Sequence, residues 1–177
     1  TDCVMLSGES AMGDHPEEAV AMLAKIAAAT EPHRSRAGLS ALRELIDEQP
    51  RPTAAEKIAS VVEHALQTVS CAVVFAPTRS GATARMISRF KPSVWIASPS
   101  ESAGTCQGLI FSYGVWPIEV AEEPSEWRDF AKRWLREHEV PGDVEMLVAG
   151  PSQRSPDANH RIEFLFVGAS PPASADR

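Results

Sequence analysis

The sequence predicts an α/β fold: a mostly parallel sheet of about five strands, flanked by helices on both faces, whose last strand runs antiparallel to its neighbour. From residue 52 onward, short runs rich in Val, Ile and Phe alternate with segments whose apolar residues recur at helical spacing. Short connections between such strands and helices are typical of a parallel sheet. The link at residues 150–160 carries no helical pattern, and a parallel crossover needs about a dozen residues or more. The strand after that link is therefore expected to be antiparallel.

The elements of this sheet can be assigned in order from residue 52. The first helix begins with a capping box, because Thr53 is followed three residues later by Glu56. A later helix is expected to start within residues 98–101, where serine caps, proline takes the first position and glutamate lies in the first turn. Two further helices are expected at residues 80–90 and from residue 127, the second with an aromatic stripe that indicates core or a subunit interface: Trp127, Phe130 and Trp134. Strands are expected at residues 72–76, 94–97, 115–120, 144–149 and 162–167.

The first 50 residues have a different pattern. Residues 4–6 are expected to form a short buried strand, followed by a helix with Asp14 as its cap and Pro16 in its first turn. A second short helix is expected at residues 39–48. One strand and one helix cannot bury their apolar side chains without further elements, so this part is predicted to be the end of a larger structure. The predicted domains are residues 1–50, residues 51–168 and a disordered Pro/Ala/Ser-rich tail at residues 169–177.

Composition narrows the function classes. The chain has 177 residues and a net charge of −7, and this acidic balance argues against a nucleic-acid surface. No apolar run approaches the roughly 18 residues of a membrane helix. Three widely spaced cysteines have neither metal-ligand nor disulfide spacing, and we expect them to be buried core residues in a reducing compartment, the cytoplasm. The histidines have no spacing that suggests a metal site, and none is predicted.

A polar loop at residues 78–83 connects the strand expected at residues 72–76 to the helix that follows it. The free N–H groups and the dipole of a helix N-terminus favour an anion, glycine permits close approach of the backbone, and hydroxyl and guanidinium groups add donors. The alternative is that Ser80 or Thr78 simply caps the helix while Arg79 is solvated. The candidate phosphate-binding residues are Thr78, Arg79, Ser80, Gly81, Ala82 and Thr83.

Several segments resemble the pyruvate kinase family, in the order and at the spacing of that family. Residues 2–20 are similar to the last strand and loop of its (β/α)₈ catalytic barrel, and "TRSGATARMISRFKP" at residues 78–92 is similar to its threonine-x-serine-glycine-x-threonine-alanine-arginine segment. Further similar segments are "PTAAEKIASVVEHAL" (52–66), "YGVWPI" (113–118), "PGDVEMLVAG" (141–150) and Asn159. The resemblance implies that residues 1–50 are a barrel remnant and residues 51–168 a C-terminal regulatory domain.

The resemblance implies an activity for an intact enzyme: phosphoryl transfer from phosphoenolpyruvate to ADP in glycolysis, with Mg²⁺ and K⁺. The family's metal-binding carboxylates, catalytic lysine and phosphate-binding arginine would lie upstream of residue 1, because a barrel needs about 250 residues. No catalytic residue, metal ligand or bound cofactor is therefore predicted here, and this fragment alone is expected to be inactive. The alternatives are a stand-alone module that binds a phosphorylated metabolite, or an oligomerisation domain with a vestigial site.

The resemblance also implies partners: a phosphorylated small-molecule effector held by the loop at residues 78–83, the rest of the barrel, and other copies of the chain in a tetramer. One segment departs from the family. Members that respond to fructose 1,6-bisphosphate have a glycine-rich loop before the last strand, whereas residues 150–162 contain only Gly150 and are stiffened by Pro156. Arg154 and His160 are candidate secondary contacts. A monophosphate effector, or a vestigial site, is therefore expected.

Overall fold

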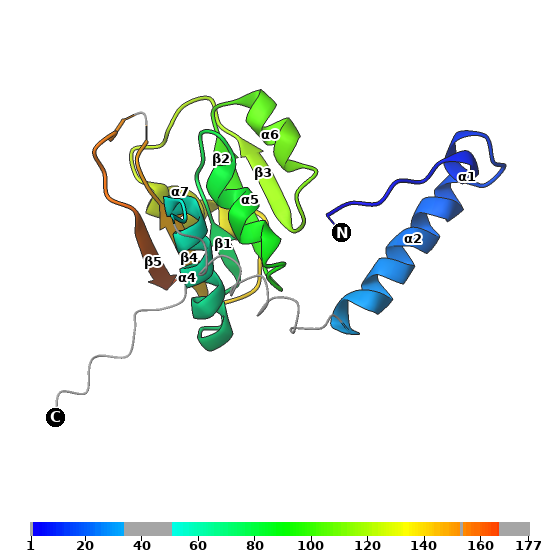
Figure 1. Ribbon diagram of the computed structural model, residues 1–177, viewed down its shortest axis with the longest axis horizontal. Coiled ribbons are helices and arrows are strands. Elements are labelled where there is room, and N and C mark those ends of the chain that lie inside the picture. Colours follow the sequence, from blue (N-terminus) through cyan, green and yellow to red (C-terminus); the bar gives the residue numbers. More distant parts are fainter. Residues whose placement is uncertain (1, 34–50, 153, 167–177) are drawn as a thin grey trace. The chain divides into compact units, whose positions relative to one another are not determined.

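A computed structural model describes residues 2–33, 51–152 and 154–166 of the chain (Figure 1). The chain divides into two units, residues 1–49 and residues 50–177, and each is described by itself. The helix expected at residues 39–48 and the tail expected from residue 169 lie outside the described residues. Whether the smaller unit is a barrel remnant stays a prediction.

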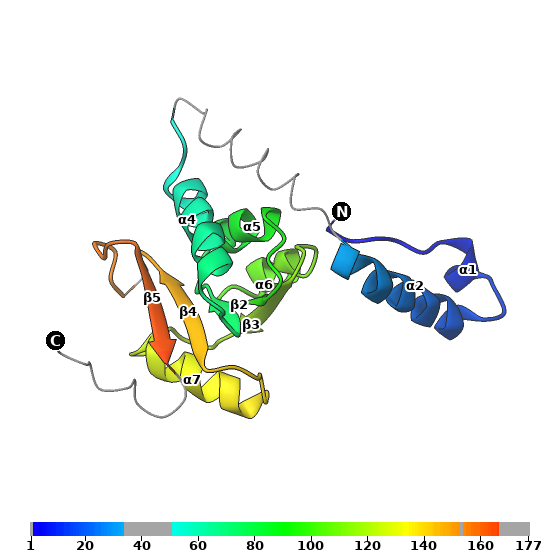
Figure 2. The same ribbon diagram turned by 90° about the horizontal axis from the view of Figure 1, so that it is seen from below.

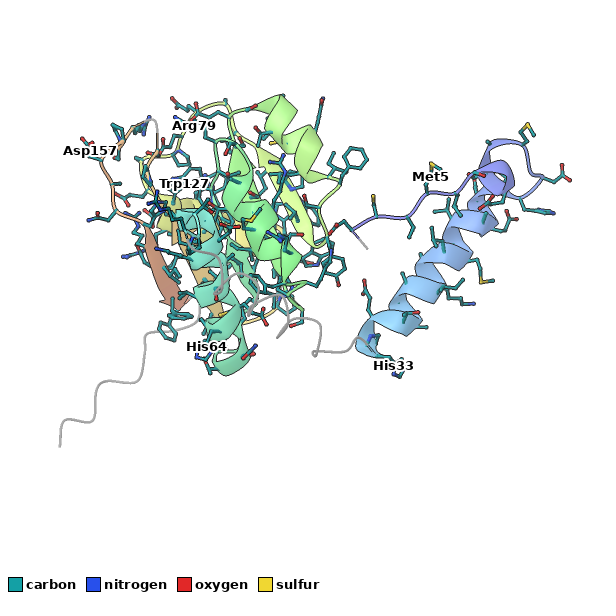
Figure 3. The ribbon with its side chains drawn as sticks, in the orientation of Figure 1. Met5, His33, His64, Arg79, Trp127 and Asp157 are labelled. Carbon is teal, nitrogen blue, oxygen red and sulfur yellow. The ribbon has the colours of Figure 1, made fainter. Side chains whose placement is uncertain are left out.

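The smaller unit is helical. Its elements are α1 (Gly8–Ala11), α2 (Pro16–Thr30) and the 3₁₀ turn η1 (Glu31–His33). The strand predicted at residues 4–6 is wrong, because those residues pair with no strand among the described residues and an unpaired strand leaves its N–H and C=O groups unsatisfied. Met5 is 87% exposed (Figure 3). Cys3, expected in the core, is exposed for the same reason.

The start of α2 differs by one residue from the prediction. Its N-cap residue is His15, which makes no side-chain capping hydrogen bond, and Asp14 lies outside the helix. Pro16 explains the shift, because its ring fixes a helical φ and so defines the first residue of the helix. None of the residues of α2 is buried.

The larger unit is built on a five-stranded sheet with the order β3-β2-β1-β4-β5. All neighbouring strands are parallel except β4 and β5, which pair antiparallel from Val144 opposite Phe166 to Ala149 opposite Arg161. The fold class and the antiparallel last strand are thus confirmed. The strands are β1 (Val73–Phe75), β2 (Trp95–Ser100), β3 (Val115–Glu119), β4 (Val144–Ala149) and β5 (Arg161–Phe166).

Helices cover both faces of this sheet. The helices are α4 (Ala54–Thr68), α5 (Ala82–Arg89), α6 (Ala103–Leu109) and α7 (Trp127–Glu137). Figure 2 shows α7 on one face and α4, α5 and α6 on the other. Under α7, the Phe75 ring lies 6.0 Å from that of Trp134 and 5.9 Å from that of Phe130. The aromatic stripe of α7 therefore belongs to the core. Cys71 and Cys106 are buried, as predicted.

The capping box at the start of α4 is confirmed. The Thr53 N–H donates to Glu56 Oε2 at 2.8 Å, and the Glu56 N–H donates to Thr53 Oγ1 at 3.3 Å. The hydrogen bond from the Thr53 backbone also lowers the pKa of the Glu56 carboxyl. The box places the first residue of α4 at Ala54.

The helix predicted to start within residues 98–101 is wrong at that position. Residues 98–100 continue β2, and α6 starts at Ala103 with Ser102 as its cap, whose hydroxyl accepts from the Thr105 N–H at 3.2 Å. Pro99 fits in the strand because its carbonyl faces the β1 side, where it accepts from the Thr78 N–H at 2.9 Å. An N–H at residue 99 would donate to the Ala76 carbonyl in a parallel ladder, and the Ser98 hydroxyl donates to that carbonyl at 2.8 Å in its place.

Candidate functional site

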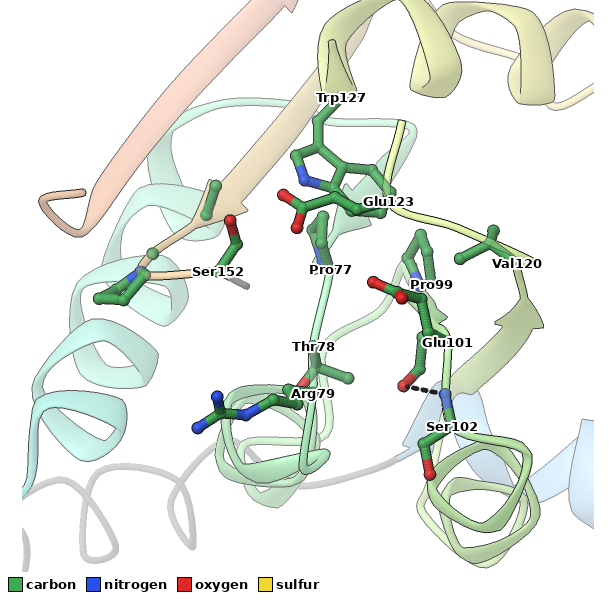
Figure 4. Close-up of a pocket in the computed structure, with 14 residues that line it drawn as sticks. Pro77, Thr78, Arg79, Pro99, Glu101, Ser102, Val120, Glu123, Trp127 and Ser152 are labelled. Atoms are coloured by element: carbon green, nitrogen blue, oxygen red, sulfur yellow. Dashed lines mark hydrogen bonds between the residues drawn. The ribbon is translucent and has the colours of Figure 1, made fainter. Parts of the chain in front are cut away.

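The candidate site lies at the edge of the sheet where β1, β2 and β4 end. Two adjoining cavities open there, one of about 240 Å³ and one of about 150 Å³. Pro77, Thr78 and Arg79 line both cavities, as does Gly150 after β4. Figure 4 shows residues from these strand ends surrounding the larger cavity. Carboxyl ends of parallel strands are where ligands bind in open α/β sheets.

The smaller cavity collects much of the predicted phosphate loop. Thr78, Arg79, Ser80 and Thr83 line it, together with His160 from the other side. None of the described residues that line it carries a carboxylate side chain. Hydroxyl and guanidinium donors without an acidic neighbour form an environment that favours an anion.

The loop conformation explains how these groups are positioned. Gly81 is the N-cap residue of α5 in a left-handed conformation, with φ +78°, and its N–H donates to Thr78 Oγ1 at 2.9 Å. The Thr78 side chain thus holds the N-cap residue of α5, and its hydroxyl proton is not used in that bond. The N–H groups of Ala82 and Thr83 lie in the first helical turn, where no intrahelical acceptor exists.

Gly81 and Ala82 do not line either cavity. A Cβ on Gly81 would lie 2.9 Å from Nη1 of Arg85 and 3.1 Å from Cδ2 of Leu109. The glycine is therefore required by its positive φ and by the packing of Arg85, and not by a close approach of ligand to its backbone. The predicted role of Gly81 in close ligand approach receives no support from this geometry.

Two residues that the sequence reasoning did not select hold the loop in place. Arg85 donates from Nη1 to the Ser80 carbonyl at 2.8 Å, and Thr105 of α6 donates from Oγ1 to the Arg79 carbonyl at 3.0 Å. Both bonds orient carbonyl oxygens of the loop. Arg85 is the last residue of the threonine-to-arginine motif at residues 78–85, so the motif could have indicated its role. No local pattern indicates the role of Thr105, because its partner is 26 residues away.

The two candidate secondary contacts lie in different places. His160 lines the smaller cavity, and its ring packs so closely on Gly150 that a Cβ there would overlap it. Arg154 lines neither cavity. Its guanidinium lies 3.9 Å from Oε2 of Glu122, and its backbone N–H donates to Glu123 Oε2 at 3.3 Å.

The larger cavity has a different chemistry, which the sequence reasoning missed. Glu101 and Glu123 line it with Trp127, and Figure 4 shows both carboxylates beside the cavity. Three serine residues also line it: Ser100, Ser102 and Ser152. Most of these residues lie at or just after the ends of β2, β3 and β4, and the strand order brings those ends together.

The described residues were also searched for side chains that could together hold a metal ion. Among residues 2–33, 51–152 and 154–166, no group of three or more His, Cys, Asp or Glu side chains comes together. We therefore assign no metal ligand to the described residues.

The fold is that of an α/β domain, and its candidate site lies at the carboxyl edge of its parallel strands. The family model for "Pyruvate kinase, alpha/beta domain" matches residues 56–159. A pyruvate kinase from Thermococcus litoralis is 47% identical over 127 residues, covering 71% of this chain and 27% of the relative. The chain belongs to the pyruvate kinase family, which confirms the resemblance of its motifs.

Further relatives agree. A pyruvate kinase from Methylorubrum extorquens is 33% identical over 172 residues, covering 94% of this chain and 35% of the relative. The crystal structure of a pyruvate kinase from Cryptosporidium parvum matches with a TM-score of 0.78 at 26% identity, covering 95% of this chain and 33% of that one. The chain thus spans about a quarter to a third of the length of these relatives.

Proposed function

We propose that the loop at residues 78–83 binds the phosphate group of a small-molecule effector. The observation that supports this most is the smaller cavity: Arg79, three hydroxyl residues and His160 line it, and no acidic residue is among the described residues of its wall. Thr83, in the first turn of α5, also lines this cavity and brings the positive end of a helix dipole to it. Such a site can hold a dianion through charge-assisted hydrogen bonds.

We further propose that this chain is the regulatory part of a cytoplasmic pyruvate kinase, which transfers a phosphoryl group from phosphoenolpyruvate to ADP with Mg²⁺ and K⁺. The support is family membership together with the names of the relatives. Phosphoryl transfer needs metal-holding carboxylates and a cation on the moving group, and we assign neither to the described residues. No described helix is long and apolar enough to cross a membrane.

A contact between copies of the chain is the second proposed role. Strand β5 lies at the edge of the sheet, and Phe164 and Phe166 on it are 40% and 54% exposed. An edge strand with exposed aromatic side chains favours pairing with another chain. Light scattering after size-exclusion chromatography tests this role. Glu replacing Phe166 is expected to lower the oligomeric state, and an unchanged mass would contradict the role of β5.

The phosphate site is tested by calorimetric titration of residues 1–177 with glucose 6-phosphate at fixed salt. Each charge-assisted hydrogen bond contributes about 1.5–3 kcal/mol. Arg79→Ala is therefore expected to weaken binding by roughly one to two decades, because about 1.4 kcal/mol corresponds to tenfold. Arg89→Ala is the matched control: it removes the same charge from the exposed end of α5, outside both cavities.

The two variants separate the interpretations of the loop. If glucose 6-phosphate and inorganic phosphate both fail to bind the unmodified chain below millimolar concentrations, the loop serves only as a helix cap. If binding occurs but Arg79→Ala and Arg89→Ala weaken it equally, the phosphate lies elsewhere.

A further inference from the structure

We infer that Glu145 and Lys132 form a latch between β4 and α7 that is operated by pH. With a neutral Glu145 carboxyl, α7 lies on the sheet as described above. Ionisation of that carboxyl draws the Lys132 ammonium group into an ion pair and moves α7 with it. The inference concerns the packing of a helix, so it does not rest on the proposed function and its test needs no ligand.

Glu145 points into the core beneath α7. Its partners across the sheet are Val73 of β1 and Leu165 of β5, and both belong to the core cluster that also contains Leu135 of α7. Paired residues of neighbouring strands share a face of the sheet, so the Glu145 side chain lies on the α7 face. It is 0% exposed, and among the described residues neither of its oxygens has a hydrogen-bond partner. An ionised carboxylate in this position is costly unless a cation reaches it.

The charged groups that face this carboxyl come from α7 and β5, because β1 contributes only Val and Phe here. Glu163 of β5 is already held by Arg128 of α7 at 3.1 Å and by Arg161 at 2.7 Å. Lys132 lies one turn after Arg128, so both side chains lie on the side of α7 towards β4 and β5. None of the ion pairs between described residues involves Lys132. Its flexible stem is therefore available to carry the ammonium group to Glu145.

Electrostatics set the pH range of the latch. Burial raises the pKa of the Glu145 carboxyl to about 7, and the Lys132 ammonium group acts in the opposite direction because it attracts the ionised form. The carboxyl is thus neutral below about pH 7 and ionised above it. Glu139 and Asp143, in the loop between α7 and β4, are exposed, and solvent screens their charges.

A movement of α7 reaches both the core and the carboxyl edge of the sheet. Trp134 of α7 lies with its ring 6.0 Å from that of Phe75 and 5.9 Å from that of Trp116. Trp127, the first residue of α7, lines the larger cavity (Figure 4). It lies about 7.5 Å from Lys132 along the helix axis. The latch therefore connects the ionisation of a buried carboxyl to the wall of that cavity.

Tryptophan emission of residues 1–177, measured from pH 5 to pH 9 without denaturant, tests the latch. Because Trp127 and Trp134 both lie on α7, we expect the emission maximum to change in a transition centred near pH 7, while the far-UV circular dichroism stays constant. Glu145→Gln cannot ionise and is expected to abolish this transition. Lys132→Met removes the cation that favours the ionised form, so the transition is expected to become smaller and to move about one pH unit higher.

Two further variants are the controls. Arg133→Met removes the neighbouring cation, whose side chain is 63% exposed and pairs with Glu137, so the midpoint is expected to stay unchanged. The ring of His138 stacks on that of Trp134 with 4.3 Å between centroids, so protonation of His138 also alters the emission. His138→Gln removes that effect and is expected to keep the transition near pH 7.

Four results would overturn the latch: an emission maximum that is constant from pH 5 to pH 9, a transition that persists in Glu145→Gln, a midpoint that responds equally to Lys132→Met and Arg133→Met, or a transition that disappears in His138→Gln. A loss of far-UV circular dichroism over the same pH range would also contradict it, because the domain would then unfold. If Glu145→Gln does not fold, the comparison of Lys132→Met with Arg133→Met decides by itself.

Discussion

At the level of single residues, Glu145 combines a carboxyl group with complete burial. It lies in β4, between β1 and β5, with 0% of its surface exposed. Among the described residues, both of its carboxylate oxygens lack a hydrogen-bond partner. Burial raises the pKa of this carboxyl to about 7, although the Lys132 ammonium group on α7 acts in the opposite direction. The folded domain therefore favours the protonated form of Glu145.

This environment predicts that stability falls as pH rises. A carboxyl whose pKa is raised in the folded state contributes its full stability below the unfolded value of 4.5, and that contribution is lost as pH rises through about 7. The shift corresponds to a loss on the order of 3 kcal/mol. Glu145→Gln cannot ionise, so the free energy of unfolding, measured by urea titration, is expected to fall less between pH 5 and pH 8 than in the unmodified chain.

The control for Glu145 is Glu137→Gln, which removes an exposed carboxylate at the end of α7. The slope of stability against pH is expected to persist in that variant. An identical slope in Glu145→Gln and in the unmodified chain would mean that Glu145 is hydrated or paired in solution.

Residue roles were predictable where the chemistry is local. In the loop at residues 78–83, the residue types and the preceding strand were enough to predict hydrogen-bond donors at a strand end. Four of these residues do line a cavity: Thr78, Arg79, Ser80 and Thr83. Glu101 and Glu123 were not predictable as a pair, because they follow different strands and meet only when β2 and β3 lie side by side. The burial of Glu145 could not be predicted, because one charged residue in an apolar run does not show whether both faces of the sheet are covered.

At the level of elements, a helix start was predicted wrongly where the local sequence pattern is compatible with both a helix and a strand. Residues 98–101 satisfy the start of a helix, yet β2 continues through them because β3 pairs with Ser98, Pro99 and Ser100. Pairing with a neighbour thus outweighs a local capping pattern. In contrast, the box between Thr53 and Glu56 is closed by its own two residues, and it was predicted correctly.

The contact between α6 and the phosphate loop yields a prediction at this scale. Thr105→Val keeps the shape of the side chain and removes the hydrogen bond to the Arg79 carbonyl. Losing this bond is expected to cost about 0.5–1.5 kcal/mol, so phosphate affinity should fall by roughly two- to tenfold if the loop is held less well. Calorimetric titration with glucose 6-phosphate measures the effect.

Thr68→Val provides the comparison for Thr105→Val. The Thr68 hydroxyl donates to the Ala65 carbonyl at 3.0 Å at the end of α4, and Thr68 lines neither cavity. Both variants are expected to lose similar stability, but only Thr105→Val should lose affinity. Equal affinity in both would show that the loop keeps its conformation without α6.

At the level of the whole molecule, the two units differ in what they bury. Every residue of the described core lies between Ala59 and Leu165, in the larger unit. In the smaller unit, α2 has no buried residue, and Val20 and Ile26 are each 55% exposed. The sequence predicted a boundary near Pro50 and Pro52, but it could not predict that no residue of α2 would be fully buried, because burial depends on what covers the helix.

This difference predicts that the larger unit carries the stability of the chain. Removing residues 1–50 is expected to leave the midpoint of thermal unfolding, followed by circular dichroism, within about 2 °C of that of the full chain, because a shift of 1 kcal/mol would move it by about 2–8 °C. Leu147→Ala in the full chain shows that the measurement is sensitive: Leu147 is 1% exposed, and deleting such a side chain costs about 2–5 kcal/mol. A midpoint lowered by the truncation as much as by Leu147→Ala would show that residues 1–50 complete the core, and that the two units fold as one.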